Sequence, residues 1–125
     1  EPFGIGAKDG TSEPIVVKGG PYNGETQIWE MKTLQTLMSM HGHSHLDILK
    51  MDVEGSEYEI IDTILDMNNK PSQLLVEFHH RFQNIGFENT INAVKNLHKI
   101  GYRIFSVSKT GRELGFIQKN LFSDL

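Results

Sequence analysis

The chain has 125 residues, of which 38% are hydrophobic, and its 12 basic and 16 acidic side chains give a net charge of -4. This length supports one hydrophobic core at most, and without a Lys/Arg cluster the charge pattern gives no support for a nucleic-acid or membrane-surface partner. The absence of cysteine excludes a disulfide framework and thiol chemistry but does not fix the cellular compartment, and no apolar run reaches transmembrane length.

The first part of the chain predicts short extended segments joined by turns. Phe3 to Ala7 is typical of the end of a strand, Lys8-Asp9-Gly10 of a tight turn, and Pro14 to Lys18 of an edge strand. The glycines of this region do not predict a nucleotide-binding loop. Such a loop follows a strand and opens a helix, whereas the residues that follow here favour another strand.

A helix is expected next, with Thr33 as its cap, an apolar face from Leu34 to His41, and Gly42 as its stop. His41, His43 and His45 then alternate along the connector, a spacing that also suits a metal site. We interpret them as a polar helix end and connector, because dedicated sites usually add a fourth ligand and further groups that orient the ligands.

The stretch from Leu46 to Glu57 carries the strongest functional signal. Its first part, Leu46 to Val53, is a strand with apolar residues on both faces, as expected of a parallel strand covered on both sides by helices. Lys50 lies within this strand and is expected either to extend its charged end to solvent or to pair with a nearby acid. Gly55 permits a sharp turn, and Ser56 followed by Glu59 is a capping-box pattern that starts the next helix.

Three acids gather where this strand ends and the helix begins. Asp52 and Glu54 follow the strand, and Glu57 falls in the first helical turn, where the helix dipole favours its ionised form. Open α/β sheets place their ligands at this junction. These acids are therefore predicted to be functional, in contrast to the solvated helix face that carries Glu59, Asp62 and Asp66.

A second parallel strand is predicted from Gln73 to Phe78, after a right-handed crossover. Glu77 and His79 are two residues apart, so they are expected on the same side, at the edge of the sheet that carries Asp52 and Glu54. This pair is compatible with a general base, with metal ligands, or with a hydrogen-bonded pair that closes the sheet. An amphipathic helix ending at Gly101 and an antiparallel pair, Tyr102 to Val107 and Leu114 to Gln118, complete the predicted elements.

The residues alone predict an α/β domain of three layers with an acidic site at the strand ends. The stretch Leu46 to Glu57 also resembles the fourth-strand motif of the FkbM family of methyltransferases. The matching residues are Asp47, Lys50, Asp52, Val53, Glu54, Gly55 and Glu57. Leu74 to His79 is similar to the family's fifth strand, and Lys32-Thr33-Leu34 to the entry before the fourth. The resemblance implies a Rossmann-like class I methyltransferase sheet that ends in an antiparallel strand pair.

The resemblance also implies a reaction and roles for named residues. The reaction is methyl transfer from S-adenosylmethionine, usually to a hydroxyl oxygen, with a small molecule or sugar as acceptor. Asp52 and Glu54 would orient the acceptor or the sulfonium, and His79, supported by Glu77, would be the base. Cofactor neighbours would be Asp9, Asp52, Gly55 and Glu57, and no metal is expected.

Residues 1–125 lack the family's glycine-rich cofactor loop, so we expect one partial methyltransferase domain, its C-terminal portion. The isolated chain would then be inactive, would bind the cofactor weakly, and would self-associate through an unpaired edge of the Leu46 to Val53 strand. Two other hypotheses stay open from the sequence: a non-catalytic binding or scaffolding fragment, and a metal-assisted hydrolase that uses Asp52, Glu54, Glu77 and His79.

Overall fold

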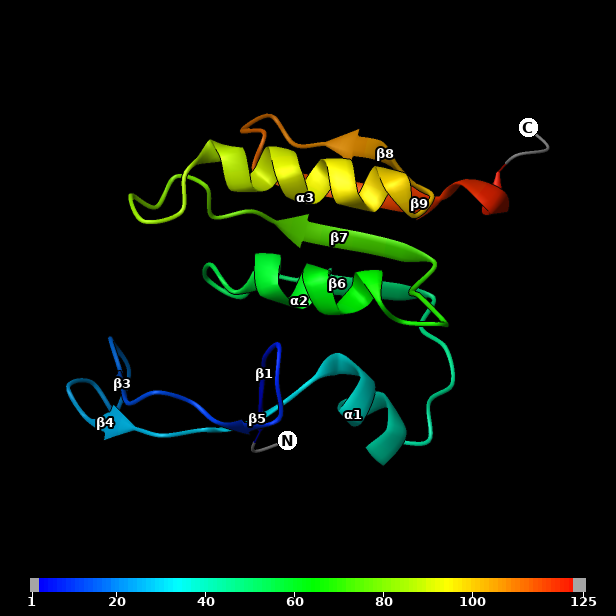
Figure 1. Ribbon diagram of the computed structural model, residues 1–125. Helices are drawn as coiled ribbons and strands as arrows, with labels where there is room; N and C mark the ends of the chain where they lie inside the picture. The colour runs from blue at the N-terminus through cyan, green and yellow to red at the C-terminus, as the bar shows by residue number, and fades with distance from the viewer. Residues whose placement is uncertain (1–2, 123–125) are drawn as a thin grey trace.

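The structure is a computed structural model that describes residues 3–122. It is a mixed α/β chain with several sheets (Figure 1). In chain order the elements are β1 (Phe3–Ile5), β2 (Gly10–Thr11), β3 (Ile15–Val16), β4 (Thr26–Gln27), β5 (Glu30–Lys32), α1 (Leu34–Met40), β6 (Ile48–Met51), α2 (Glu57–Leu65), β7 (Gln73–Glu77), α3 (Phe87–Lys99), β8 (Tyr102–Val107), β9 (Glu113–Gln118) and the 3₁₀ helix η1 (Lys119–Leu121). No helix among the described residues is long and apolar enough to cross a membrane.

The largest sheet has four strands in the order β6-β7-β9-β8. Strands β6 and β7 are parallel, with Met51 opposite Val76, so their carboxyl ends lie at the same edge. Strand β9 runs antiparallel to both β7 and β8. The predicted crossover between two parallel strands and the predicted antiparallel ending are therefore confirmed, and the right-handedness of the crossover stays a prediction.

Helices α2 and α3 pack against each other on one face of this sheet (Figure 1). Their apolar residues meet a row of buried side chains that alternates along the strands, as the period of two requires. In β7, Leu74 and Val76 are buried, and Ile60, Ile61 and Ile64 of α2 are fully buried against them in one hydrophobic core. Burying each such side chain contributes about 2 kcal/mol to folding, which makes this face the stable part of the molecule.

The opposite face of β6 is not covered by any described helix. Ile48 is 55% exposed and Lys50 is exposed, whereas Met51 on the other face is buried. The prediction that both faces of this strand are buried is thus wrong for residues 3–122. Lys50 is exposed and forms no ion pair with a described residue, so of the two expectations for this side chain the structure shows the solvent-exposed one. The three-layer arrangement stays a prediction.

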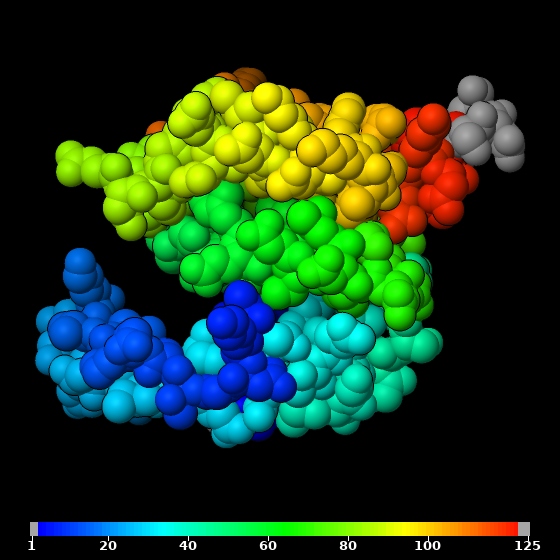
Figure 2. All heavy atoms as spheres, viewed as in Figure 1, coloured from blue at the N-terminus to red at the C-terminus, as the bar shows by residue number. Residues whose placement is uncertain are grey.

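The N-terminal segments form two small sheets, and Figure 2 shows these segments beside the main body. Strand β5 pairs in parallel with β1 and antiparallel with β2, while β3 and β4 form a two-residue antiparallel pair. Strand β3 covers only two residues of the strand predicted from Pro14 to Lys18, and its Ile15 and Val16 are exposed. Few of these residues bury apolar area, so this region depends on local hydrogen bonds.

Helix α1 begins and ends as predicted. The hydroxyl of Thr33 accepts a hydrogen bond from the backbone N–H of Thr36 at 3.1 Å. At the other end Gly42 has a φ of 69°, and the N–H of His43 donates to the carbonyl of Met38. A glycine in the left-handed conformation, followed by a backbone N–H that donates back to the last helical turn, is a common helix stop.

Strand β6 lies at one edge of the main sheet, since among the described residues it pairs only with β7. Its free edge presents unpaired backbone N–H and C=O groups. The predicted self-association through this edge stays a prediction.

Candidate functional site

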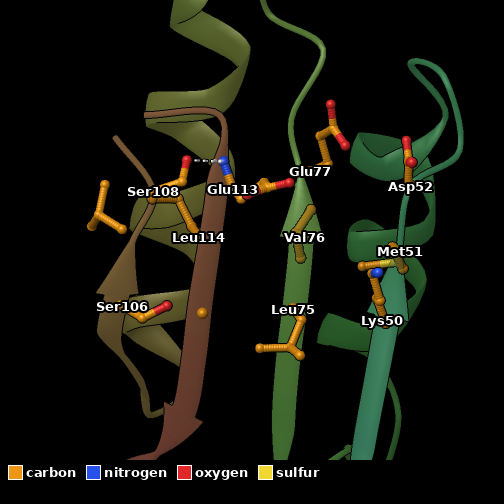
Figure 3. Close-up of a pocket in the computed structure, with 12 residues that line it drawn as sticks. Lys50, Met51, Asp52, Leu75, Val76, Glu77, Ser106, Ser108, Glu113 and Leu114 are labelled. Atoms are coloured by element: carbon orange, nitrogen blue, oxygen red, sulfur yellow. Dashed lines mark hydrogen bonds between the residues drawn. The ribbon is translucent and has the colours of Figure 1, made fainter. Parts of the chain in front are cut away.

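The carboxyl ends of β6 and β7 bring the predicted site residues to one edge of the sheet. Figure 3 shows Asp52 just beyond β6 and Glu77 at the end of β7. This placement follows from the parallel register, in which Lys50 faces Leu75 and Met51 faces Val76. The edge is the place where open α/β sheets bind ligands.

A tight turn carries the chain from β6 into α2. Glu54 and Gly55 both have positive φ values, 52° and 111°. A Cβ atom on Gly55 would lie 3.0 Å from Cδ1 of Ile85, so a glycine is needed both for the backbone angle and for the close approach of the loop before α3. This turn directs the Glu57 side chain back under the strand ends.

The predicted capping box at Ser56 does not form. Ser56 already has helical backbone angles and its side chain makes no capping hydrogen bond. The carboxylate of Glu57 instead accepts a hydrogen bond from the N–H of Gly55 at 3.0 Å. The first turn of α2 is thus held by a buried acid rather than by a serine hydroxyl.

Glu57 and His79 form the buried half of the cluster, and both are fully buried. One carboxylate oxygen of Glu57 lies 2.8 Å from Nδ1 of His79 and also accepts from the His79 backbone N–H at 2.7 Å. Backbone N–H groups can only donate, so Glu57 acts as a hydrogen-bond acceptor through both oxygens. The Nδ1 atom of His79 is therefore the donor, and in the neutral imidazole Nε2 carries the lone pair.

Asp52 and Glu54 form the exposed half. Their carboxylate oxygens lie 3.5 Å and 3.8 Å from Nε2 of His79, and their side chains are 48% and 75% exposed. Nε2 itself is buried and has no hydrogen-bond partner among the described residues. One oxygen from each acid and Nε2 all lie within 4.8 Å of one another. We refer to Asp52, Glu54, Glu57 and His79 as the edge cluster.

Glu77 is not a member of this cluster. Strand β7 ends at Glu77, and both Phe78 and His79 are buried, so the alternation that predicted Glu77 and His79 on the same side stops there. Glu77 makes an ion pair with Arg81 at 3.8 Å and no hydrogen bond or ion pair with His79. The acid that supports His79 is Glu57, which sequence reasoning placed near the site without this role.

Three of the predicted cofactor neighbours are engaged by the protein itself. Both oxygens of Asp9 hold the start of α1, at 2.7 Å from the N–H of Thr33 and 2.8 Å from the hydroxyl of Thr36. The Thr33 N–H, and then the Thr36 hydroxyl, hold the pKa of Asp9 below its ordinary value. Glu57 accepts three hydrogen bonds from within the chain, one of them from the N–H of Gly55. Asp52 alone among the four has a side chain free of hydrogen bonds within residues 3–122.

The three histidines of the connector do not converge. His45 bridges Asn69 and Ser72, at 3.0 Å and 2.9 Å, while the rings of His41 and His43 lie 5.9 Å apart. The group of Asp52, Glu54 and His79 is the one metal-compatible set of three that the described residues form. The interpretation of the histidine run as a connector agrees with this placement.

An open pocket of about 560 Å³ lies on the bare face of the sheet next to the edge cluster (Figure 3). Its polar lining includes Lys50, Asp52, Glu77, Ser106, Ser108 and Glu113. Its volume is in the range of small-molecule sites. Asp52 belongs both to this pocket and to the edge cluster, so it joins a binding space to the buried histidine.

Sequence reasoning missed the pocket-lining residues of the C-terminal hairpin. Ser106 and Ser108 come from β8 and the turn after it, and Glu113 begins β9 opposite Glu77. Gly115 lies close to β8, since a Cβ atom there would be 2.9 Å from Cζ of Phe105. Gly115 is the sequence signal from which these residues could have been found, because a lone glycine inside an apolar strand indicates close backbone approach.

Comparison with known proteins gives two matches. A family profile described as "Methyltransferase FkbM domain" matches residues 2–104. A protein of Rattus norvegicus described as "Probable methyltransferase-like protein 24" is 24% identical over 121 residues, which cover 88% of this chain and 32% of that protein. The chain thus spans about a third of the length of this relative. No solved structure matches the chain.

Proposed function

The chain belongs to the FkbM methyltransferase family, and from this premise we propose that it takes part in methyl transfer from S-adenosylmethionine to a hydroxyl oxygen of a small molecule or sugar. The observation that carries the proposal is the position of Asp52, which lines the open pocket and faces Nε2 of His79 at 3.5 Å. An acceptor in the pocket would therefore present its hydroxyl group to the edge cluster.

The pocket supports an acceptor rich in hydroxyl groups. Carboxylates of Asp52, Glu77 and Glu113 accept hydrogen bonds from hydroxyls, while Lys50 and the two serines donate to them. Leu75 and Val107 are among the apolar residues of the lining. This mixture of polar and apolar groups suits a sugar or a similar hydroxylated small molecule.

S-adenosylmethionine would supply an electrophilic methyl group, so the protein's tasks are to align the acceptor and to remove its proton. The exposed carboxylates of Asp52 and Glu54 bind and orient the hydroxyl. His79 lies behind them with its lone pair toward them, and it takes up the proton while Glu57 stabilises the resulting imidazolium. Glu57 thereby performs the supporting role expected of Glu77.

The described residues offer few free groups to the cofactor itself. Asp9, Gly55 and Glu57 are already hydrogen bonded within the chain, and the edge of β6 has no neighbouring strand among residues 3–122. We therefore propose that residues outside this chain complete the cofactor pocket. Calorimetry on the 125-residue chain alone should detect weak binding or none, and micromolar affinity would contradict this part of the proposal.

Methyl transfer is tested with the full-length protein, S-adenosylmethionine carrying a labelled methyl group, and a panel of sugars and small hydroxylated compounds. We expect label in an O-methylated product and release of S-adenosylhomocysteine. Failure of the full-length protein to bind S-adenosylmethionine would overturn the proposal. A labelled N-methyl product would preserve methyl transfer but refute the hydroxyl acceptor.

A further inference from the structure

The edge cluster contains a buried imidazole nitrogen that the protein leaves without a hydrogen bond. Nε2 of His79 belongs to a fully buried residue, and no described residue donates to it or accepts from it. Its ring is fixed on one side by Glu57 through Nδ1 and covered by Phe82, whose ring centroid lies 5.0 Å away. A buried nitrogen that is held so firmly and left unpaired indicates that something absent from the chain binds it.

We propose that Asp52, Glu54 and His79 bind a divalent first-row transition cation, Mn²⁺ or Zn²⁺, through one carboxylate oxygen each and Nε2. Adjacent ligand atoms around such an ion are roughly 3.0–3.5 Å apart, because metal–ligand bonds are about 2.0–2.2 Å long. The distances from Nε2 are 3.5 Å and 3.8 Å, and the whole set lies within 4.8 Å. A small rotation of the two exposed carboxylates closes this difference.

The surroundings of His79 match those of a metal-ligating histidine. Such a histidine donates its second ring N–H to a carboxylate or a carbonyl, which fixes the tautomer and turns the lone pair toward the ion. Glu57 accepts from Nδ1 of His79 at 2.8 Å and is held by two backbone N–H groups. The arrangement of carboxylate, imidazole and open position is therefore already assembled.

Charge also favours a cation here. Asp52 and Glu54 have no Lys or Arg within ion-pair distance among the described residues, and the only partner of either acid is His79. Glu57 adds a third carboxylate next to the same ring. A divalent ion would balance this local negative charge, whereas a neutral imidazole does not.

The ligand set decides which cation binds. One imidazole nitrogen with two carboxylate oxygens suits Mn²⁺ and Zn²⁺, while Ca²⁺ takes six to eight oxygen ligands. The three ligands leave coordination positions open toward solvent. A hydroxyl bound there would lose its proton more readily, with the proton passing to solvent, so the cation would replace His79 as the activating group. This role rests on the proposed function, but the binding does not.

The test is a Mn²⁺ titration of the full-length protein followed by electron paramagnetic resonance, without cofactor or acceptor. We expect one strong site whose signal shows nitrogen hyperfine coupling. Asp52→Asn and Glu54→Gln should each weaken binding about 100-fold, and Glu57→Gln about 10-fold to 100-fold. Zn²⁺ should displace Mn²⁺ at lower concentration than Ca²⁺ does.

Matched controls come from the exposed acids of α2. Asp62→Asn and Glu59→Gln remove the same charges from solvated positions and should leave the affinity unchanged. Equal affinity in Asp52→Asn and Asp62→Asn, no nitrogen coupling, or no binding at millimolar Mn²⁺ would overturn the site. Absence of binding would leave methyl transfer with His79 as base intact, and absence of methyl transfer would leave the Mn²⁺ result intact.

Discussion

The buried and exposed halves of the edge cluster differ in what the fold requires of them. Glu57 and His79 are fully buried, and the hydrogen bonds of Glu57 join α2 to the end of β7. Asp52 and Glu54 are only a few residues away, yet they are exposed and their one partner is a nitrogen at 3.5 Å or more. Packing and hydrogen bonding explain Glu57 and the Nδ1 side of His79, but not the exposed acids or the unpaired Nε2 of His79. Function is therefore to be sought on the side of the cluster where Asp52, Glu54 and Nε2 meet.

The largest effect is expected from Glu57→Ala. This change leaves the buried backbone and ring N–H groups of His79, and the part-buried N–H of Gly55, without an acceptor, which should lower the free energy of unfolding by about 3–5 kcal/mol. Denaturant unfolding measures the change. Glu59→Ala, on the exposed face of the same helix, should stay within about 0.5 kcal/mol of the wild type. If the two variants unfold alike, the buried half has no structural role and the comparison fails.

Gly55→Ala tests the turn that separates the two halves. Gly55 has a φ of 111° and its Cβ would approach Ile85 to 3.0 Å, whereas Gly101 has a φ of 102° with nothing nearby. The positive φ should destabilise both alanine variants by about 1–2 kcal/mol. Gly55→Ala should unfold more easily than Gly101→Ala because Ile85 must also move. Equal melting temperatures for the two variants would show that the close approach is not important.

Tyr58 follows Glu57 in α2 and makes the stability of this region pH dependent. Burial, with a smaller contribution from the charge of Glu57, raises the pKa of Tyr58, while a hydrogen bond to Thr90 at 2.8 Å opposes the shift. A raised pKa in the folded state means that stability is fully present below about pH 10 and falls as the pH rises further.

Tyr58→Phe should therefore lower the free energy of unfolding by about 1 kcal/mol near neutral pH, because the hydrogen bond is lost. Its free energy of unfolding should also fall less steeply as the pH rises above about 10. Unfolding measured from pH 8 to pH 11 checks this. Parallel pH profiles for the wild type and Tyr58→Phe would refute the contribution of Tyr58.

Asp9→Asn should have the smallest effect on stability. It tests the hydrogen bonds of a carboxylate at an exposed position, where burial makes no contribution. Asp9 resembles Glu57 in that both of its oxygens accept hydrogen bonds, but it is exposed. Its pKa is lowered from 3.8 chiefly by the N–H of Thr33. Its contribution is thus present above about pH 4 and is lost as the pH falls through the lowered pKa. Thermal melting from pH 2 to pH 5 should show a shallower acid decline in Asp9→Asn, and an unchanged decline would contradict this account.

The parts of the fold that could be predicted are those in which one residue pattern decides the structure. The strand predicted from Gln73, the Thr33 cap and the Gly42 stop depend on neighbours in sequence, and all three are confirmed. The burial of both faces of β6 could not be predicted reliably. An apolar strand indicates that it is covered, but not that the covering segments lie within residues 3–122.

The sequence predicts where the candidate site lies, but not which acid forms a hydrogen bond with His79. Asp52, Glu54 and His79 meet at the expected edge, because the parallel register brings strand ends together. The partner of His79 was assigned to Glu77 by strand alternation, which stops where β7 ends. Glu57 lies 22 residues away in sequence and reaches His79 only because Glu54 and Gly55 turn the chain sharply. No local pattern contains that information.

The most direct test of the central claim, that the exposed half serves function rather than folding, is turnover and melting temperature measured together for full-length Asp52→Asn. We expect methyl transfer to fall about 100-fold or more, as for the loss of a group that acts on the reacting atoms, with stability within about 0.5 kcal/mol of the wild type. Asp62→Asn should change neither quantity. Full activity with a lowered melting temperature would make Asp52 structural and would contradict the account.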